Sequence, residues 1–229
     1  MKICGLMKTT LLDFPGKVAC TVFVGGCNLR CPFCHNSELA FAENGDIIPE
    51  NEFFDFLEKR KGLLEGVCVT GGEPLMHEEI FDFIKSIKDM GYSVKLDTNG
   101  CFPKRLEKAL KSGDIDYVAM DIKTSLKEYE RAVGIDGFSP EQIEKSIEIL
   151  KNSGIEYELR TTVVKGIHSE KSIRELAKTI KNEKRYFLQG FKKSERVPDG
   201  DLEEFSEEEM KNLLKVAKEY VPDAVLRGV

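Results

Sequence analysis

Residues 17–34 read KVACTVFVGGCNLRCPFC and join a strand signal directly to a group of cysteines. The stretch Lys17–Val24 is apolar and rich in β-branched residues, and Gly25-Gly26 ends it, a pattern that predicts a buried strand. Three cysteines follow within eight residues: Cys27, Cys31 and Cys34. We therefore expect a strand whose carboxyl end leads straight into a loop of three thiols.

A short strand followed by an amphipathic helix recurs along the rest of the chain. In the helix predicted over Glu78–Met90, apolar residues recur at spacings of three and four, and Gly91 ends the helix. Further helices are predicted over Pro49–Arg60, Pro103–Lys111, Pro140–Asn152, Ser169–Lys181 and Glu207–Tyr220. Further strands are predicted over Gly66–Thr70, Tyr92–Asp97, Tyr117–Ile122, Ile155–Val164, Tyr186–Leu188 and Ala224–Leu226.

This alternation, repeated about six times, predicts an α/β fold with a parallel sheet and helices outside it. Six or seven units are too few for a closed eight-unit barrel, so we expect an incomplete, laterally open (β/α)6-type TIM barrel. A doubly wound open sheet is the alternative, because periodicity does not separate the two. No linker or internal repeat divides the sequence, and we expect one domain over residues 1–229.

Composition narrows the class of protein. The 229 residues include 34 Lys and Arg against 40 Asp and Glu, and the formal net charge of −6 disfavours nucleic acid as a partner. No apolar run of roughly 18 residues occurs, and Lys2, Lys8 and Asp13 interrupt the amino-terminal segment. We therefore expect neither a membrane span nor a signal peptide, and a cytoplasmic location. Seven cysteines, an odd number, do not suggest a disulfide framework, and four are expected to be core residues: Cys4, Cys20, Cys68 and Cys101.

The spacing of Cys27, Cys31 and Cys34 suits one inorganic centre held from a single loop. Soft thiolate ligands select zinc or an iron–sulfur cluster. A structural zinc site needs a fourth ligand, and His35 adjoins Cys34, which makes simultaneous ligation awkward. Three ligands on a four-iron cluster would leave one iron open to a substrate. The cluster is the favoured interpretation, with a closed zinc site and coincidental core cysteines as alternatives.

Other motifs fall where successive predicted strands end. Gly71-Gly72-Glu73-Pro74 follows the second strand. Its glycines allow a ligand to approach the backbone closely, and Glu73 offers a hydrogen-bond acceptor. Without the neighbouring motifs, this segment would be interpreted as an ordinary turn. Asp97-Thr98-Asn99-Gly100 follows the third strand and Asp121-Ile122-Lys123 the fourth, where a single Asp often caps the next helix. Together they predict a site at the rim where parallel barrels carry function.

Some residues are left with two interpretations. Arg160 in the fifth strand needs a partner, which is either a ligand carboxylate or ribose, or an internal Asp or Glu. His77 and His168 each open a helix, where capping or solvent exposure is the favoured explanation. A basic loop is either solvated or contacts an acidic partner protein, and it contains Lys192, Lys193 and Arg196.

The cysteine spacing, with Phe33 just before the third cysteine, resembles the cluster motif of the radical S-adenosylmethionine (SAM) enzymes. Leu12-Asp13-Phe14-Pro15-Gly16 and residues 26–36, GCNLRCPFCHN, look like the activases of glycyl-radical enzymes. Among these, the sequence is most similar to the activating proteins of anaerobic ribonucleoside-triphosphate reductase, and next to pyruvate formate-lyase activating enzyme. The resemblance extends over nearly the whole chain.

The resemblance implies a [4Fe–4S] cluster on the three cysteines and a SAM molecule beside it. The Gly-Gly-Glu segment would hold the amino group of SAM, and a monovalent cation could lie at Asp97, Thr98 and Asp121. The residues expected to bind SAM are Phe33, Gly71, Gly72, Glu73, Asp97, Asp121, Lys123, Arg160 and Gln189. Gln189 stands where the pyruvate formate-lyase branch has a His, which weakens the assignment to that branch.

The implied activity is reductive cleavage of SAM to a 5′-deoxyadenosyl radical, which removes an α-hydrogen from a glycine of a partner enzyme. The implied partner is an anaerobic ribonucleotide reductase, and the electron donor a flavodoxin or ferredoxin in a reducing, oxygen-poor cytoplasm. Two alternatives stay open. One is a radical SAM enzyme that acts on a small molecule, as 7-carboxy-7-deazaguanine synthase does; the other is a zinc-stabilised binding module without catalysis.

Overall fold

The computed structural model describes residues 1–41 and 47–228, and eight strands in it form one sheet in chain order. The edge strand β1 (Ile3–Thr10) pairs antiparallel with β2, and every later pairing is parallel. The parallel strands are β2 (Ala19–Val24), β3 (Gly66–Gly71), β4 (Ser93–Thr98), β5 (Tyr117–Asp121), β6 (Glu156–Val163), β7 (Tyr186–Gly190) and β8 (Val225–Arg227). No pairing among the described residues joins β8 back to β1, so the barrel is open.

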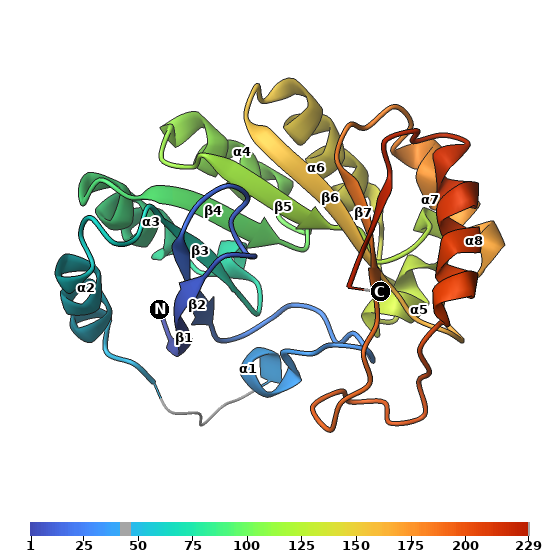
Figure 1. Ribbon diagram of the computed structural model, residues 1–229, viewed down its shortest axis with the longest axis horizontal. Coiled ribbons are helices and arrows are strands. Elements are labelled where there is room, and N and C mark those ends of the chain that lie inside the picture. The colour runs from blue at the N-terminus through green and yellow to red at the C-terminus, as the bar shows by residue number, and fades with distance from the viewer. Residues whose placement is uncertain (42–46, 229) are drawn as a thin grey trace.

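Helices connect the parallel strands and cover the outer side of the sheet, as Figure 1 shows. They are α2 (Glu50–Lys59), α3 (Ile80–Asp89), α4 (Pro103–Ser112), α6 (Glu141–Asn152), α7 (Glu170–Thr179) and α8 (Glu207–Lys218). Short turns of helix lie in the connections: α1 (Ser37–Phe41), η1 (Pro74–Met76), η2 (Leu126–Glu128) and α5 (Tyr129–Val133). Six strand–helix units followed by a last strand confirm the predicted open (β/α)6-type barrel.

Local sequence explains most of these elements. In α3 the four periodic apolar residues are all buried: Ile80, Phe83, Ile84 and Ile87. Ser169 and Ser206 begin α7 and α8, each with a capping box that satisfies the first free backbone N–H groups. Gly113 ends α4 in the left-handed conformation at φ 79°.

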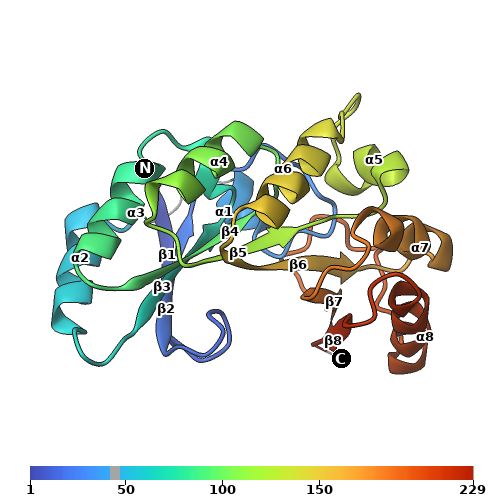
Figure 2. The ribbon, with the colours of Figure 1, turned by 90° about the horizontal axis from the view of Figure 1, so that it is seen from above.

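The predicted set lacked β1, and the description of the sheet as parallel needs correction at this edge. Only the first and last residues of β1, Ile3 and Thr10, are buried. A strand with so little burial has no apolar alternation for a sequence pattern to detect. Figure 2 shows the loop between β1 and β2 on the side of the sheet away from α4 and α6.

Three of the four isolated cysteines are core residues, as expected. Cys20, Cys68 and Cys101 are buried in the core, whereas Cys4 is half-buried, with its sulfur close to Gly25. All seven thiols are free. None of the helices in the described ranges combines the length and apolar character needed to cross a membrane.

Candidate functional site

A cavity of about 260 Å³ at the carboxyl ends of the strands contains the three clustered thiols, and we call it the thiol cavity. Every residue predicted to hold the cluster or SAM lines it except Glu73. The lining includes Cys27, Cys31, Phe33, Cys34, Gly71, Gly72, Asp97, Asp121, Lys123, Arg160 and Gln189. Residues separated by up to 162 positions (27 to 189) are therefore gathered at one rim.

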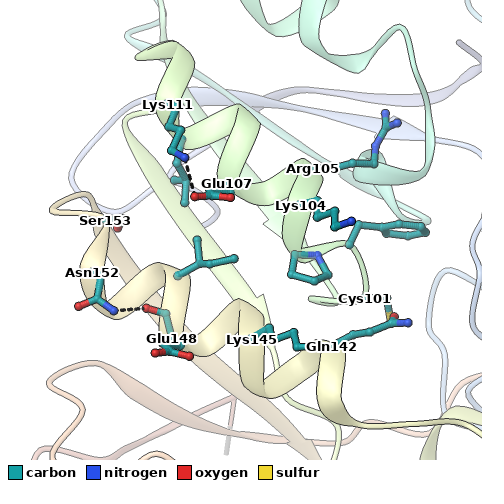
Figure 3. Close-up of a pocket in the computed structure, with 14 residues that line it drawn as sticks. Cys101, Lys104, Arg105, Glu107, Lys111, Gln142, Lys145, Glu148, Asn152 and Ser153 are labelled. Atoms are coloured by element: carbon teal, nitrogen blue, oxygen red, sulfur yellow. Dashed lines mark hydrogen bonds and ion pairs between the residues drawn. The ribbon is translucent and has the colours of Figure 1, made fainter.

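A larger cavity of about 910 Å³ lies on the outer face between α4 and α6 (Figure 3). Charged side chains at its edges pair locally, as in the Lys111–Glu107 contact within α4. Cys101 is its one thiol. Because the clustered thiols and the strand-end carboxylates gather elsewhere, we assign the candidate site to the thiol cavity despite its smaller size.

The cysteine loop, residues 25–36, is held by backbone contacts to distant segments. Gly26 N donates to Leu39 O at 3.0 Å, Arg30 N donates to Val133 O at 2.8 Å, and the carbonyl of Pro32 accepts from Asp199 N at 3.1 Å. The loop is thus fixed from three sides, which positions the thiols before any centre binds.

Burial raises the pKa of all three clustered thiols, and that of Cys31 to about 12. A thiol in such surroundings becomes a thiolate when a positive centre binds it. Among the described residues, no three His, Cys, Asp or Glu side chains are grouped as ligands of a single metal ion would be. A four-iron cluster does not require its thiolates to converge on one atom, because each thiolate binds a different iron. The donor set therefore fits a cluster.

Two glycines bring the end of β3 against the cysteine loop. A Cβ on Gly72 would lie 1.8 Å from the carbonyl oxygen of Gly26, and Gly71 has φ +117°. Neither position accepts another residue without displacing backbone. The close packing lets Gly72 N donate to Val24 O at 2.8 Å and Glu73 N donate to Gly26 O at 2.9 Å.

The carboxylate of Glu73 is fully buried behind the cavity wall. It accepts hydrogen bonds from Leu75 N at 3.0 Å, Thr98 Oγ1 at 2.8 Å and Asn99 N at 2.7 Å. Burial raises the pKa of Glu73 to about 7, because these donors offset only part of the desolvation. Its visible role is to hold the segment after β4.

An ion network forms one wall of the cavity. Arg160 Nε lies 2.8 Å from Asp121 Oδ1, and its NH1 lies 3.1 Å from Asp97 Oδ2. Lys123 lies 3.0 Å from Asp121, and Lys95 forms a short contact with Asp97. The internal partner considered for Arg160 is therefore present: Asp97 and Asp121 contact it closely, and Glu158 lies 3.9 Å away.

The balance of charge in this network decides what it can bind. Burial alone would raise the pKa of Asp121, but Arg160 and Lys123 outweigh it and hold the pKa below its usual value. Asp97 and Asp121 face Lys95, Lys123 and Arg160. Glu158 lies 3.9 Å from Arg160 but is matched by Arg227, so the linked network has one positive charge in excess. Such a wall suits an anionic ligand group. It gives no support to the monovalent cation predicted at Asp97, Thr98 and Asp121, and Thr98 instead donates to Glu73.

The explanation by capping or solvent exposure was wrong for the two histidines. The N-caps of α3 and α7 are Glu79 and Ser169, His77 is half-buried and His168 is buried. His168 is 5% exposed; Val164 N donates to its Nδ1 at 3.0 Å, and its Nε2 lies 2.7 Å from Lys123 O. His77 Nε2 lies 2.7 Å from Gly25 O. Both rings tie loops at the strand ends together, which spacing along the chain does not reveal.

Sequence reasoning missed two further residues. Lys95 is 1% exposed within β4, and the argument that singled out Arg160, a charge in an apolar strand, would have found it. Asn99 is buried and contacts the cysteine loop, but a lone Asn after a strand carries no distinctive signal.

The basic loop lies against the cysteine loop. The carbonyl of Lys192 is 2.7 Å from His35 Nε2, and the carbonyl of Arg196 accepts from Ser37 Oγ. Lys192 pairs with Glu204 at 3.3 Å, and Arg196 is 4.0 Å from Glu38 with its side chain 71% exposed. Contact with an acidic partner stays a prediction.

Comparison with known proteins gives this geometry a context. Residues 21–180 match the model of the radical SAM superfamily. A Methanocaldococcus jannaschii protein provisionally named a glycyl-radical enzyme activating enzyme is 31% identical, over 99% of this chain and 96% of its own length. Pyruvate formate-lyase-activating enzyme of Clostridium pasteurianum is 29% identical over 96% of this chain and 98% of that protein.

Among solved structures, Streptococcus suis SuiB bound to S-adenosylmethionine superposes with a TM-score of 0.69 at 16% identity. The match covers 91% of this chain and 52% of SuiB, so the chain spans about half the length of that protein and shares its fold. The family uses a [4Fe–4S] cluster and SAM, and the thiol cavity offers a matching donor set. The chain is a member of the radical SAM superfamily and an enzyme of that class.

Proposed function

We propose that this chain is the activase of a glycyl-radical enzyme, with an anaerobic ribonucleotide reductase as its partner. The observation that carries the proposal is the likeness to two proteins named as activating enzymes over nearly the full length of both chains. The stretch Leu12–Gly16 and the residues after Cys34 add the resemblance to the activating proteins of that reductase.

In this proposal Cys27, Cys31 and Cys34 would hold the cluster, and SAM would lie beside it in the thiol cavity. When bound, the cluster and SAM supply a carbon-centred radical that can abstract a hydrogen atom. The excess positive charge at Lys123 and Arg160 attracts the carboxylate of SAM. The backbone of Gly71 and Gly72 lies on the cavity surface, available to its amino group.

The open barrel supports a macromolecular substrate. No hydrogen bonds close the sheet between β8 and β1 in the described part of the chain. A loop that carries a glycine has to reach the cavity, and a closed barrel offers only the rim for entry. The electron donor in this proposal is a flavodoxin or a ferredoxin.

The test uses anaerobically purified protein with its cluster, SAM, a reductant and the candidate ribonucleotide reductase. We expect SAM cleavage and a glycyl radical doublet by electron paramagnetic resonance (EPR). The doublet should collapse to a narrower line when the partner is labelled with α-deuterated glycine. A partner with its glycine changed to alanine is the matched control and should give no signal.

Two results would contradict the proposal. SAM cleavage without a protein radical, across the available glycyl-radical enzymes, would favour a small-molecule substrate. A colourless protein with tightly bound zinc would contradict the cluster ligands themselves.

A further inference from the structure

Asn99 is a buried residue that joins three segments of the site. It follows β4 directly, and its backbone N–H donates to Glu73 Oε2 at 2.7 Å. Its side-chain Oδ1 accepts from Cys101 N at 3.0 Å. Because an amide oxygen must face that N–H, the orientation of the Asn99 amide is determined, and its nitrogen points the other way.

On that other side lies the cysteine loop. Asn99 Nδ2 donates to Asn28 Oδ1 at 2.9 Å and to Cys27 Sγ at 3.8 Å, so each of its two hydrogens has an acceptor. Leu29 N also donates to Cys27 Sγ, at 3.4 Å. The thiol of Cys27 thus sits among N–H dipoles aimed at its sulfur.

The amide is held firmly. Glu73, which fixes the backbone of Asn99, is itself fully buried and also accepts from Thr98 Oγ1 and Leu75 N. The chain of contacts runs from the Gly-Gly-Glu segment through Asn99 to the cysteine loop. These contacts give the buried carboxylate of Glu73 a structural role, which is to hold Asn99 in place. That role does not depend on contact with a ligand.

We infer that Asn99 raises the reduction potential of the cluster by donating a hydrogen bond to the Cys27 thiolate. The inference rests on the proposed cluster ligands. One-electron reduction adds one negative charge that is shared between iron and its thiolates, and an N–H dipole on a ligand sulfur stabilises the more negative form. The amide neither gains nor loses a proton, so the step consumes one electron and nothing else. Asn99 acts through Cys27 and is a positioning residue.

The experiment compares midpoint potentials of the loaded protein without SAM, measured by EPR during a dithionite titration. Asn99→Asp keeps an acceptor for Cys101 N but replaces the donor by a negative charge, and Asn99→Ala removes the donor alone. Both should shift the potential to more negative values, with the larger shift for Asn99→Asp. Asn36→Ala is the matched control, because the Asn36 amide also lies at this cavity but donates to Gly71 O, and its potential should equal that of the wild type.

Measuring the iron and sulfide content of each protein shows whether a negative result contradicts the role of Asn99 or the proposed cluster ligands. Wild-type protein without four irons would contradict the ligand set. Fully loaded Asn99 variants with the wild-type potential would contradict the role of Asn99 alone. If the variants do not load, wild-type protein with 15N-labelled asparagine side chains decides the question. A 15N hyperfine coupling to the reduced cluster is expected, and its absence would overturn the inference.

Discussion

Both ends of the barrel contain partly buried ion pairs, but the two ends differ in net charge and in the residues that surround the pairs. At the thiol cavity, Asp97 and Asp121 face three basic groups and share the space with three thiols. At the amino ends of β5 and β6, the carboxylate of Glu158 accepts from Tyr117 OH at 3.0 Å, and Arg227, the last residue of β8, reaches it at 2.8 Å. The ring of Phe14, in the loop before β2, lies 6.2 Å from that of Tyr117.

The difference in net charge distinguishes a binding site from an ion pair that has only a structural role. Glu158 also lies 3.9 Å from Arg160, but with Arg227 it forms a pair of zero net charge, so the amino end has no charge to offer a ligand. The network at the thiol cavity has one positive charge in excess and cannot be balanced from within. Ion pairing alone therefore does not identify a functional site in this fold; the uncompensated charge beside the thiols does.

The largest expected effect is loss of the cluster. Cys31→Ala should abolish iron binding and SAM cleavage and leave the circular dichroism of the barrel unchanged, because a ligand is removed without a large change in packing. Cys20→Ala is the control: it empties a buried position in β2, far from any predicted ligand role, and should retain full iron content. Normal iron content in the Cys31 variant would refute its role as a ligand.

Arg160→Gln should cost about 2–3 kcal/mol of unfolding free energy, because two half-buried carboxylates lose their guanidinium but keep Lys95 and Lys123. It should also weaken SAM binding roughly tenfold or more, since a charged hydrogen-bonding group is lost. The measurements are denaturant unfolding and equilibrium dialysis of SAM.

Arg227→Gln provides the matched test at the amino end. Its side chain is 37% exposed, so water replaces part of the pair, and we expect a loss of about 1–2 kcal/mol with unchanged SAM affinity. Equal loss of SAM affinity in both variants would remove the distinction between the two ends.

The two buried glutamates also differ, because Glu73 has three neutral donors where Glu158 has an arginine. Burial raises the pKa of Glu73 from 4.5 to about 7, so the folded chain holds this proton more tightly than the unfolded chain. Its contribution to stability should fall as the pH rises from 4.5 to about 7, by up to about 1.4 kcal/mol per pH unit. Glu73→Gln should remove that component from thermal melting curves. Parallel pH profiles for the two proteins would show that Glu73 does not titrate in this window.

The smallest effect on stability is expected in the loop between β1 and β2. The side chain of Leu12 is 90% exposed, and Leu12→Ser should change stability by no more than about 0.5 kcal/mol. Phe14, two residues on, is 2% exposed, and Phe14→Leu should cost about 1 kcal/mol. Calorimetry checks both values. Either variant losing SAM affinity would link this loop to the thiol cavity.

The sequence was informative wherever a signal is local. Periodicity located each major helix and every parallel strand, because apolar spacing reflects which side of a single element is buried. It could not find β1, which is held at the edge by pairing with β2 rather than by its own burial. Spacing likewise misjudged His168, which contacts Val164 in its own connection and Lys123 in the loop after β5.

By itself, then, the sequence determined the barrel units and the loop of three thiols, because both are set within a few residues of chain. The tertiary structure alone decided which charges meet. Arg160 lies 39 and 63 residues from its two carboxylates, and the register of β5 against β6 places Asp121 beside it. It also decided that Glu73 faces Asn99 rather than the cavity. Strand register and side-chain direction follow from the packing of the whole sheet, and no local pattern encodes them.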